Sequence, residues 1–153
     1  MPDTISPAQR SRIMASIHSH DTAPEVFFRK RLFSRGYRYS VCPKKMPGTP
    51  DMWLRKWKVA IFIHGCFWHC HKGCKVAHVP DSRQEYWLTK FARNMERDAE
   101  VKERLKAKGI RVLIVWECSV RRMMRKRLGA ETEAEIMPKV EAFIKSGGEY
   151  LEI

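Results

Sequence analysis

The sequence lacks a long hydrophobic run, a signal-like N-terminus and enough acidic residues to balance its basic ones. No segment approaches the roughly 20 apolar residues of a membrane span, so we expect no membrane insertion. The first residues, Met1 to Pro7, have neither a basic flank nor an apolar core, and we expect no signal peptide. Internal repeats and low-complexity linkers are also absent. The 153 residues therefore predict one domain over 1–153, with a helical arm over about 1–20.

A fully paired disulfide framework is excluded because the chain has five cysteines, an odd number. Cys66, Cys70 and Cys74 lie close together in the sequence and are interspersed with histidines. This arrangement favours a reduced, cytoplasmic protein that uses its thiolates to bind metal.

Positive charge is abundant. The chain has thirty Lys and Arg residues and only 17 Asp and Glu residues, which gives a net charge of +13 and an isoelectric point near 9.9. A domain with this charge is attracted to polyanions, and nucleic acid is the first candidate.

Hydrophobic periodicity predicts an α/β fold with helices flanking a mixed sheet. Two apolar runs, at 58–63 and 111–116, are typical of buried strands, and a long amphipathic helix lies between them. The expected helices cover about 6–18, 22–35, 83–108, 120–128 and 134–145, and the expected strands cover 37–42, 52–55, 58–63 and 111–116.

The segment from Val59 to Cys74 passes from an apolar strand into a loop rich in Cys and His. Thiolate and imidazole are the preferred zinc ligands, and four of them complete a tetrahedral site. We choose Cys66, His71, Cys74 and Cys118 as ligands, with Cys70 as the spare. The simpler explanation is that some of these are buried free thiols.

A carboxylate follows the turn Pro47-Gly-Thr-Pro and stands at the start of a predicted strand, at Asp51. Carboxylate oxygens hold Mg²⁺ in phosphodiester hydrolysis, and the Ile63 backbone carbonyl is a suitable second ligand. Asp51 taken alone is better explained as a cap of the Pro turn. His64 and His69 are candidates for a general base, a zinc ligand or a phosphate contact.

Two adjacent aromatic residues, Phe67 and Trp68, lie on the same loop. Exposed rings on a rigid loop can wedge between base pairs, and Trp87 can join them from the following helix. A helical Trp is more often part of a core.

Several motifs together resemble the very-short-patch-repair (Vsr) endonucleases, which nick one strand of DNA beside a T:G mismatch. The resemblance covers most of residues 8–120. The motifs are Arg10-Ser-Arg-Ile-Met14, Asp21-Thr22 with Glu25, Pro47-Gly-x-Pro-Asp51, Phe62-Ile-His-Gly-Cys-Phe-Trp-His69, Asn94-Met-Glu-Arg-Asp98 and Gly109-Ile-Arg-Val-Leu-Ile-Val-Trp-Glu-Cys118.

The resemblance implies a restriction-endonuclease-like fold, a catalytic Mg²⁺ and a structural Zn²⁺. It implies Asp51 and the Ile63 carbonyl as Mg²⁺ ligands and His69 as the general base. The active site would be completed by His64, Glu25 and Asp98. Zinc would be bound by Cys66, His71, Cys74 and Cys118, and the intercalating residues would be Phe67, Trp68, Trp87 and Met14.

The sequence therefore predicts a Mg²⁺-dependent, zinc-stabilised endonuclease that nicks duplex DNA at T:G mismatches. The expected partners are double-stranded DNA and mismatch-repair proteins, and the expected state is a monomer. Two alternatives stay open. One is a nicking or restriction-type endonuclease acting on matched or modified DNA, and the other is a zinc-loop DNA-binding protein without catalysis.

Overall fold

A computed structural model describes residues 5–16 and 20–153. Within these residues the chain forms one five-stranded sheet in the order β1-β2-β3-β4-β5, together with five α-helices and one 3₁₀ turn. The elements are α1 Pro7–Ser16, α2 Ala23–Ser34, β1 Ser40–Val41, β2 Met52–Leu54, η1 Arg55–Trp57, β3 Val59–His64, α3 Gln84–Ala107, β4 Arg111–Trp116, α4 Glu117–Met124, α5 Gly129–Ser146 and β5 Tyr150–Glu152.

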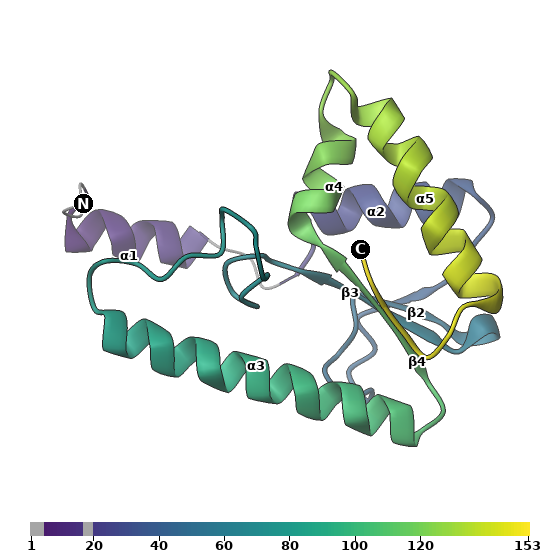
Figure 1. Cartoon of the computed structure of the whole chain (residues 1–153), viewed down its shortest axis with the longest axis horizontal. Coiled ribbons are helices and arrows are strands. Elements are labelled where there is room, and N and C mark those ends of the chain that lie inside the picture. The colour runs from purple at the N-terminus through teal and green to yellow at the C-terminus, as the bar shows by residue number, and fades with distance from the viewer. Residues whose placement is uncertain (1–4, 17–19) are drawn as a thin grey trace.

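The sheet is mixed, as the sequence predicts. Strands β1, β2 and β3 are antiparallel, whereas β4 runs parallel to β3 and β5 parallel to β4. Helix α3 makes the crossover from β3 to β4 and lies on one face of the sheet, while α2, α4 and α5 cover the other face (Figure 1). The expected α/β class is therefore confirmed.

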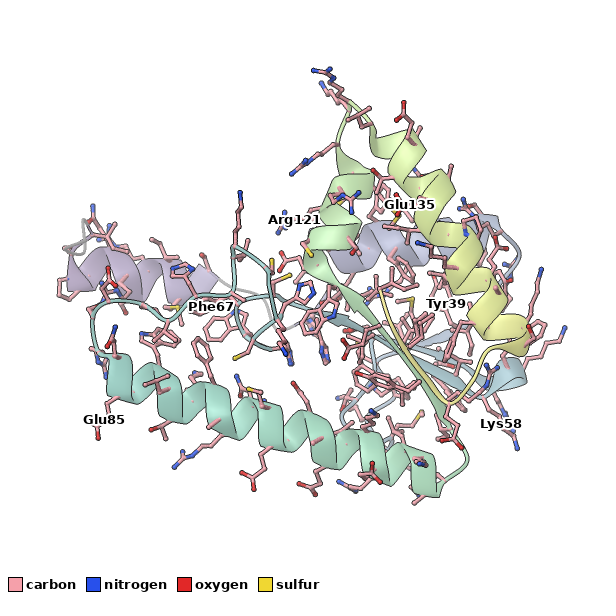
Figure 2. All side chains as sticks on the ribbon, viewed as in Figure 1. Tyr39, Lys58, Phe67, Glu85, Arg121 and Glu135 are labelled. Atoms are coloured by element: carbon pink, nitrogen blue, oxygen red, sulfur yellow. The ribbon has the colours of Figure 1, made fainter. Side chains whose placement is uncertain are left out.

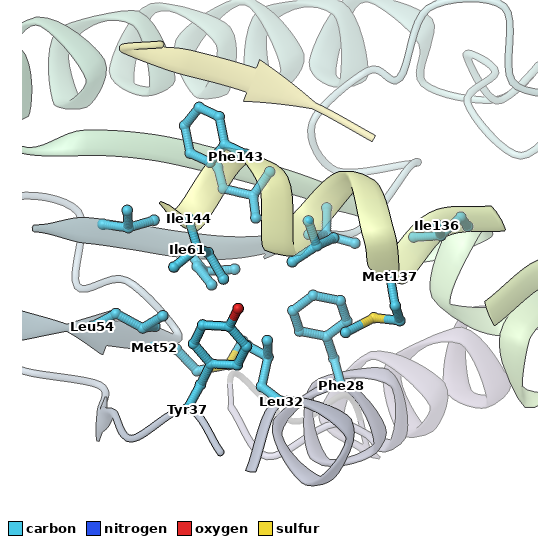
Figure 3. Close-up of a cluster of buried hydrophobic side chains, with 14 of the residues drawn as sticks. Phe28, Leu32, Tyr37, Met52, Leu54, Ile61, Ile136, Met137, Phe143 and Ile144 are labelled. Carbon is cyan, nitrogen blue, oxygen red and sulfur yellow. The ribbon is translucent and has the colours of Figure 1, made fainter. Parts of the chain in front are cut away.

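The main core lies between the sheet and helices α2, α4 and α5 (Figure 3). Phe28 and Leu32 of α2 are fully buried there, and they pack with Ile61 of β3 and with residues of α5 such as Ile144. Side chains alternate across a strand, so the neighbouring residues of β3 and β4 face α3 instead, where they form a second cluster. Both faces of these strands are thus buried, which explains their uninterrupted apolar sequences.

Thr22 caps α2 as predicted, because its Oγ1 accepts a hydrogen bond from the Glu25 backbone N–H at 3.5 Å. Other boundaries differ from the expectation. The strand expected over 37–42 is limited to Ser40–Val41, α4 begins at Glu117, and α5 starts earlier than predicted, at Gly129. The predicted end of the first helix, near residue 18, lies outside the described residues.

Two features of the structure were not predicted. Strand β5 was not predicted, because its three residues carry no apolar run. In α3, Leu88 and Met95 have the spacing of a buried stripe, yet each side chain is 55% exposed. Only the second half of α3 lies against the sheet, and its first half extends beyond it (Figure 1). Within residues 5–16 and 20–153, no helix combines the length and the apolar character that crossing a bilayer requires.

Candidate active site and metal centre

A pocket of about 610 Å³ lies between α3 and the sheet. It gathers every residue proposed for catalysis, although these come from α2, the turn before β2, β3, the following loop and α3. Its lining residues are Glu25, Gly48, Thr49, Asp51, Phe62, Ile63, His64, His69, Arg97, Asp98, Ala99, Val101, Lys102, Val112, Ile114 and Tyr150.

Asp51 stands directly before β2, at the end of the Pro-Gly turn. The neighbouring strand orients its carboxylate, because the Ile63 backbone N–H donates a hydrogen bond to Oδ2 at 2.6 Å. Burial, helped by the nearby Glu25 carboxylate and opposed by this hydrogen bond, raises the pKa of Asp51 to about 7. Ionising this half-buried carboxylate is therefore costly in the free protein, and a bound cation would stabilise its ionised form.

His69 is held by Asp98, whose Oδ2 lies 2.6 Å from His69 Nδ1. A carboxylate can only accept hydrogen bonds, so the imidazole tautomer that fits this contact has its proton on Nδ1 and its lone pair on Nε2. The His64 ring stacks on His69 with 3.8 Å between centroids and 8° between planes. Burial lowers the pKa of His64 to about 3, which keeps its imidazole neutral.

The ligand atoms of His64, His69 and Asp98 also lie within 4.8 Å of one another, as in a metal site. However, the lone pairs of an imidazole lie in the plane of its ring. Two rings stacked at 8° direct these lone pairs along parallel planes, so they do not converge on one ion. The geometry favours a base with its supporting groups over a metal site.

Arg29 was missed by the sequence reasoning. It is only 8% exposed, and its Nη1 and Nη2 lie 2.5 Å from Asp21 Oδ1 and 3.3 Å from Glu25 Oε2. Glu25 is 6% exposed, so this guanidinium compensates a charge that burial would otherwise destabilise. The spacing of four residues between Glu25 and Arg29 on a helix is the signal that could have indicated the pair.

The cysteine-rich loop forms a second centre next to the pocket. Ligand atoms of Cys66, His71, Cys74 and Cys118 all lie within 4.8 Å of one another, and these are the four residues chosen from the sequence. Cys118 Sγ lies 3.5 Å from His71 Nδ1. Cys70, with a left-handed φ of 53°, is not part of this group.

This donor set fits zinc. Three sulfurs and one imidazole nitrogen are a common composition of closed tetrahedral zinc sites. Burial raises the pKa of the Cys66 thiol to about 12, so this sulfur becomes a thiolate only beside a cation. Since Cys118 is the second residue of α4, a metal here would join the loop to the end of β4.

Phe67 lies at the centre of an aromatic cluster between the loop and α3 (Figure 2). Its ring centroid is 5.1 Å from Trp68, 5.3 Å from Trp87 and 5.1 Å from Phe91. The rings of Phe67, Trp68 and Trp87 are only partly buried. Phe91 is 6% exposed and was not expected in this group. Met14, on α1, is 39% exposed.

Comparison with known proteins gives consistent results. A family model described as DNA mismatch endonuclease Vsr matches residues 2–75. The DNA mismatch endonuclease Vsr of Escherichia coli is 42% identical over 121 residues, which cover 79% of this chain and 77% of that protein. The type II nicking enzyme V.NmeAIP of Neisseria meningitidis is 43% identical over 121 residues, covering 79% and 86%. The type II nicking enzyme V.XorIIP of Xanthomonas oryzae is 41% identical over 120 residues, covering 78% and 88%.

Proposed function

The chain belongs to the Vsr family of DNA endonucleases, and on that premise we propose that it nicks one strand of duplex DNA beside a T:G mismatch in a Mg²⁺-dependent reaction. The observation that carries the proposal is the convergence of Asp51, His69 and Asp98 in one pocket, with an aromatic cluster on the same loop as His69.

In the proposed mechanism, His69 acts as the general base. Its Nε2 accepts the proton of the attacking water, while Asp98 holds the ring in the required tautomer and stabilises the imidazolium that forms. His64 packs against His69 and limits its rotation. Glu25, oriented by Arg29, faces the same pocket and is placed to accept a hydrogen bond from the water.

The donor set around Asp51 suits a hard divalent ion. Mg²⁺ prefers oxygen ligands and retains several waters, so the Asp51 carboxylate and the Ile63 carbonyl are sufficient protein ligands. When bound, Mg²⁺ would neutralise negative charge on the phosphate oxygens in the transition state. We propose that zinc, bound by Cys66, His71, Cys74 and Cys118, has a structural role.

We propose that Phe67, Trp68 and Trp87 enter the base stack from one side, with Met14 of α1 assisting. The partial exposure of the three rings and their contacts with one another support this role. A wobble pair is easier to open than a Watson–Crick pair, so the rings insert most readily at a mismatch. We further propose that the protein acts on DNA in the cytoplasm, as a monomer.

The decisive experiment is strand-resolved cleavage of three duplexes of one sequence, with a T:G mismatch, with full pairing and with methylated cytosine. The proposal expects a Mg²⁺-dependent nick in the thymine strand of the mismatched duplex. Equal nicking of the matched duplex would contradict it. Absence of any nick, with DNA binding retained, would favour a binding protein without catalysis.

One alternative has a specific observation in its favour. The relatives from Neisseria and Xanthomonas are named type II nicking enzymes. An enzyme that nicks matched or modified DNA would use the same pocket, and the three-duplex experiment separates it from the mismatch enzyme.

A further inference from the structure

The lining of the active-site pocket includes a lysine that the proposed mechanism does not use. Lys102 of α3 is half-buried, and its Nζ lies 3.6 Å from the centroid of the Tyr150 ring. The ring is itself held in place, because the Tyr150 hydroxyl donates a hydrogen bond to the Glu152 carboxylate. A cation over an aromatic face is stabilised and kept in position, yet it retains N–H groups for another acceptor.

Lys102 has no ion-pair partner in the described part of the chain. Asp98 precedes it by four residues on the same helix, which is a favourable spacing for a salt bridge. Asp98 is bound to His69 instead, and Lys102 is bound to the ring. By contrast, the exposed Lys106, one turn further on, lies 3.4 Å from Glu149.

The pocket lining carries charges of both signs. Its carboxylates are Glu25, Asp51 and Asp98, and its lysine and arginine residues are Lys102 and Arg97. Of these two, Arg97 is exposed and donates a hydrogen bond to Asn94 at 3.2 Å. Lys102 is the half-buried cation of the two, and its ammonium group can still donate hydrogen bonds to a bound anion.

We propose that Lys102, positioned by the Tyr150 ring, binds a non-bridging oxygen of the phosphate next to the scissile phosphate on the nicked strand. Four helical residues, about 6 Å of rise, separate Lys102 from Asp98, the residue that holds His69. This separation is close to the spacing of neighbouring phosphates along a strand. The ligand is therefore a backbone phosphate, read without regard to base identity. This inference rests on the proposed nicking function.

The test compares Lys102→Met with Lys106→Met, which removes the same charge from the same helix outside the pocket. Lys102→Met keeps the length of the side chain but cannot bond phosphate. It should lower kcat/KM on the T:G duplex by roughly 10- to 100-fold, the range for a hydrogen bond between charged groups. It should also reduce the salt slope of binding by about one. Lys106→Met should change neither value by more than a small factor.

A neutral methylphosphonate placed at single positions of the nicked strand identifies the contact. At the position next to the scissile bond it should weaken wild-type binding, and it should have no further effect on Lys102→Met. Lys102→Arg and Tyr150→Phe should behave nearly as wild type, because they keep the charge and the ring.

Additive effects of Lys102→Met and the methylphosphonate at every position would overturn the inference, as would equal losses in the two Met variants. Melting temperature and zinc content identify a variant that is simply unfolded, and Lys102→Gln, which also removes the charge, then carries the comparison. If the wild-type protein binds DNA but does not nick it, the proposed function fails, while the binding and salt data still decide the phosphate contact.

Discussion

Replacing Asp51 with Asn should abolish nicking and, without Mg²⁺, should make the protein more stable. The Asn side chain keeps an oxygen to accept the Ile63 N–H bond of 2.6 Å but carries no charge to bury. Burial moves the pKa of Asp51 from 3.8 to about 7, a shift worth roughly 4 kcal/mol at 1.36 kcal/mol per unit.

The direction of the effect follows from proton binding. Between pH 3.8 and about 7 the native state keeps this proton and the unfolded chain releases it. Native stability therefore falls as the pH rises, by about 1.4 kcal/mol per unit, and the loss is complete above the folded-state pKa. The advantage of Asp51→Asn should thus grow by about 2 kcal/mol between roughly pH 5.5 and 8.

The assay is urea unfolding of zinc-loaded protein at both pH values, first without Mg²⁺ and then with it. Mg²⁺ should stabilise the wild type and leave Asp51→Asn unchanged, because ligand binding stabilises only the state that binds. Glu100→Gln, which removes an exposed carboxylate from α3, is the matched control. A stability difference that does not change with pH, or Mg²⁺-dependent nicking by Asp51→Asn, would refute the reasoning.

Three further outcomes test the other assignments. Cys66→Ser should lose zinc and unfold, whereas Cys70→Ser should keep both metal and stability, and metal analysis showing the reverse would overturn the ligand choice. His69→Ala should slow single-turnover nicking by roughly 10²–10⁴-fold at unchanged zinc content, and loss of zinc would instead identify a ligand. Trp68→Ala should weaken T:G binding by about one to two powers of ten at an unaltered salt slope, since a base–aromatic stack contributes about 1–3 kcal/mol. A lowered melting temperature with an unchanged T:G-to-matched ratio would show that Trp68 is a core residue.

The sequence predicted those parts of the fold whose signals are local. Strands β3 and β4 are buried on both faces and therefore consist of continuous apolar residues. The Thr22 cap and the helical spacing of α3 are equally local. The family motifs then indicated which histidines and carboxylates lie together in one site. The pocket contains Asp51, His69 and Asp98, as those motifs predicted.

The remaining features depend on contacts between distant segments. Tyr150 belongs to a short strand at the sheet edge next to β4, and nothing near it in the sequence indicates that it meets Lys102. The exposure of Leu88 and Met95 likewise follows from the length of α3 relative to the sheet, which periodicity does not reveal. Arg29 was visible as a helical neighbour of Glu25, but its burial was not.

The edge-to-face packing of Phe67 against Trp68, Trp87 and Phe91 has a consequence for how the protein searches DNA. In the free protein these rings already satisfy one another, so entering a duplex exchanges one set of aromatic contacts for another. In the proposed insertion, the contacts given up within the cluster offset part of the stacking gained with the bases, so the cost of opening the base pair decides where insertion is favourable. We therefore expect this strongly basic protein to slide over matched DNA on phosphate contacts and to stop at a pair that opens easily.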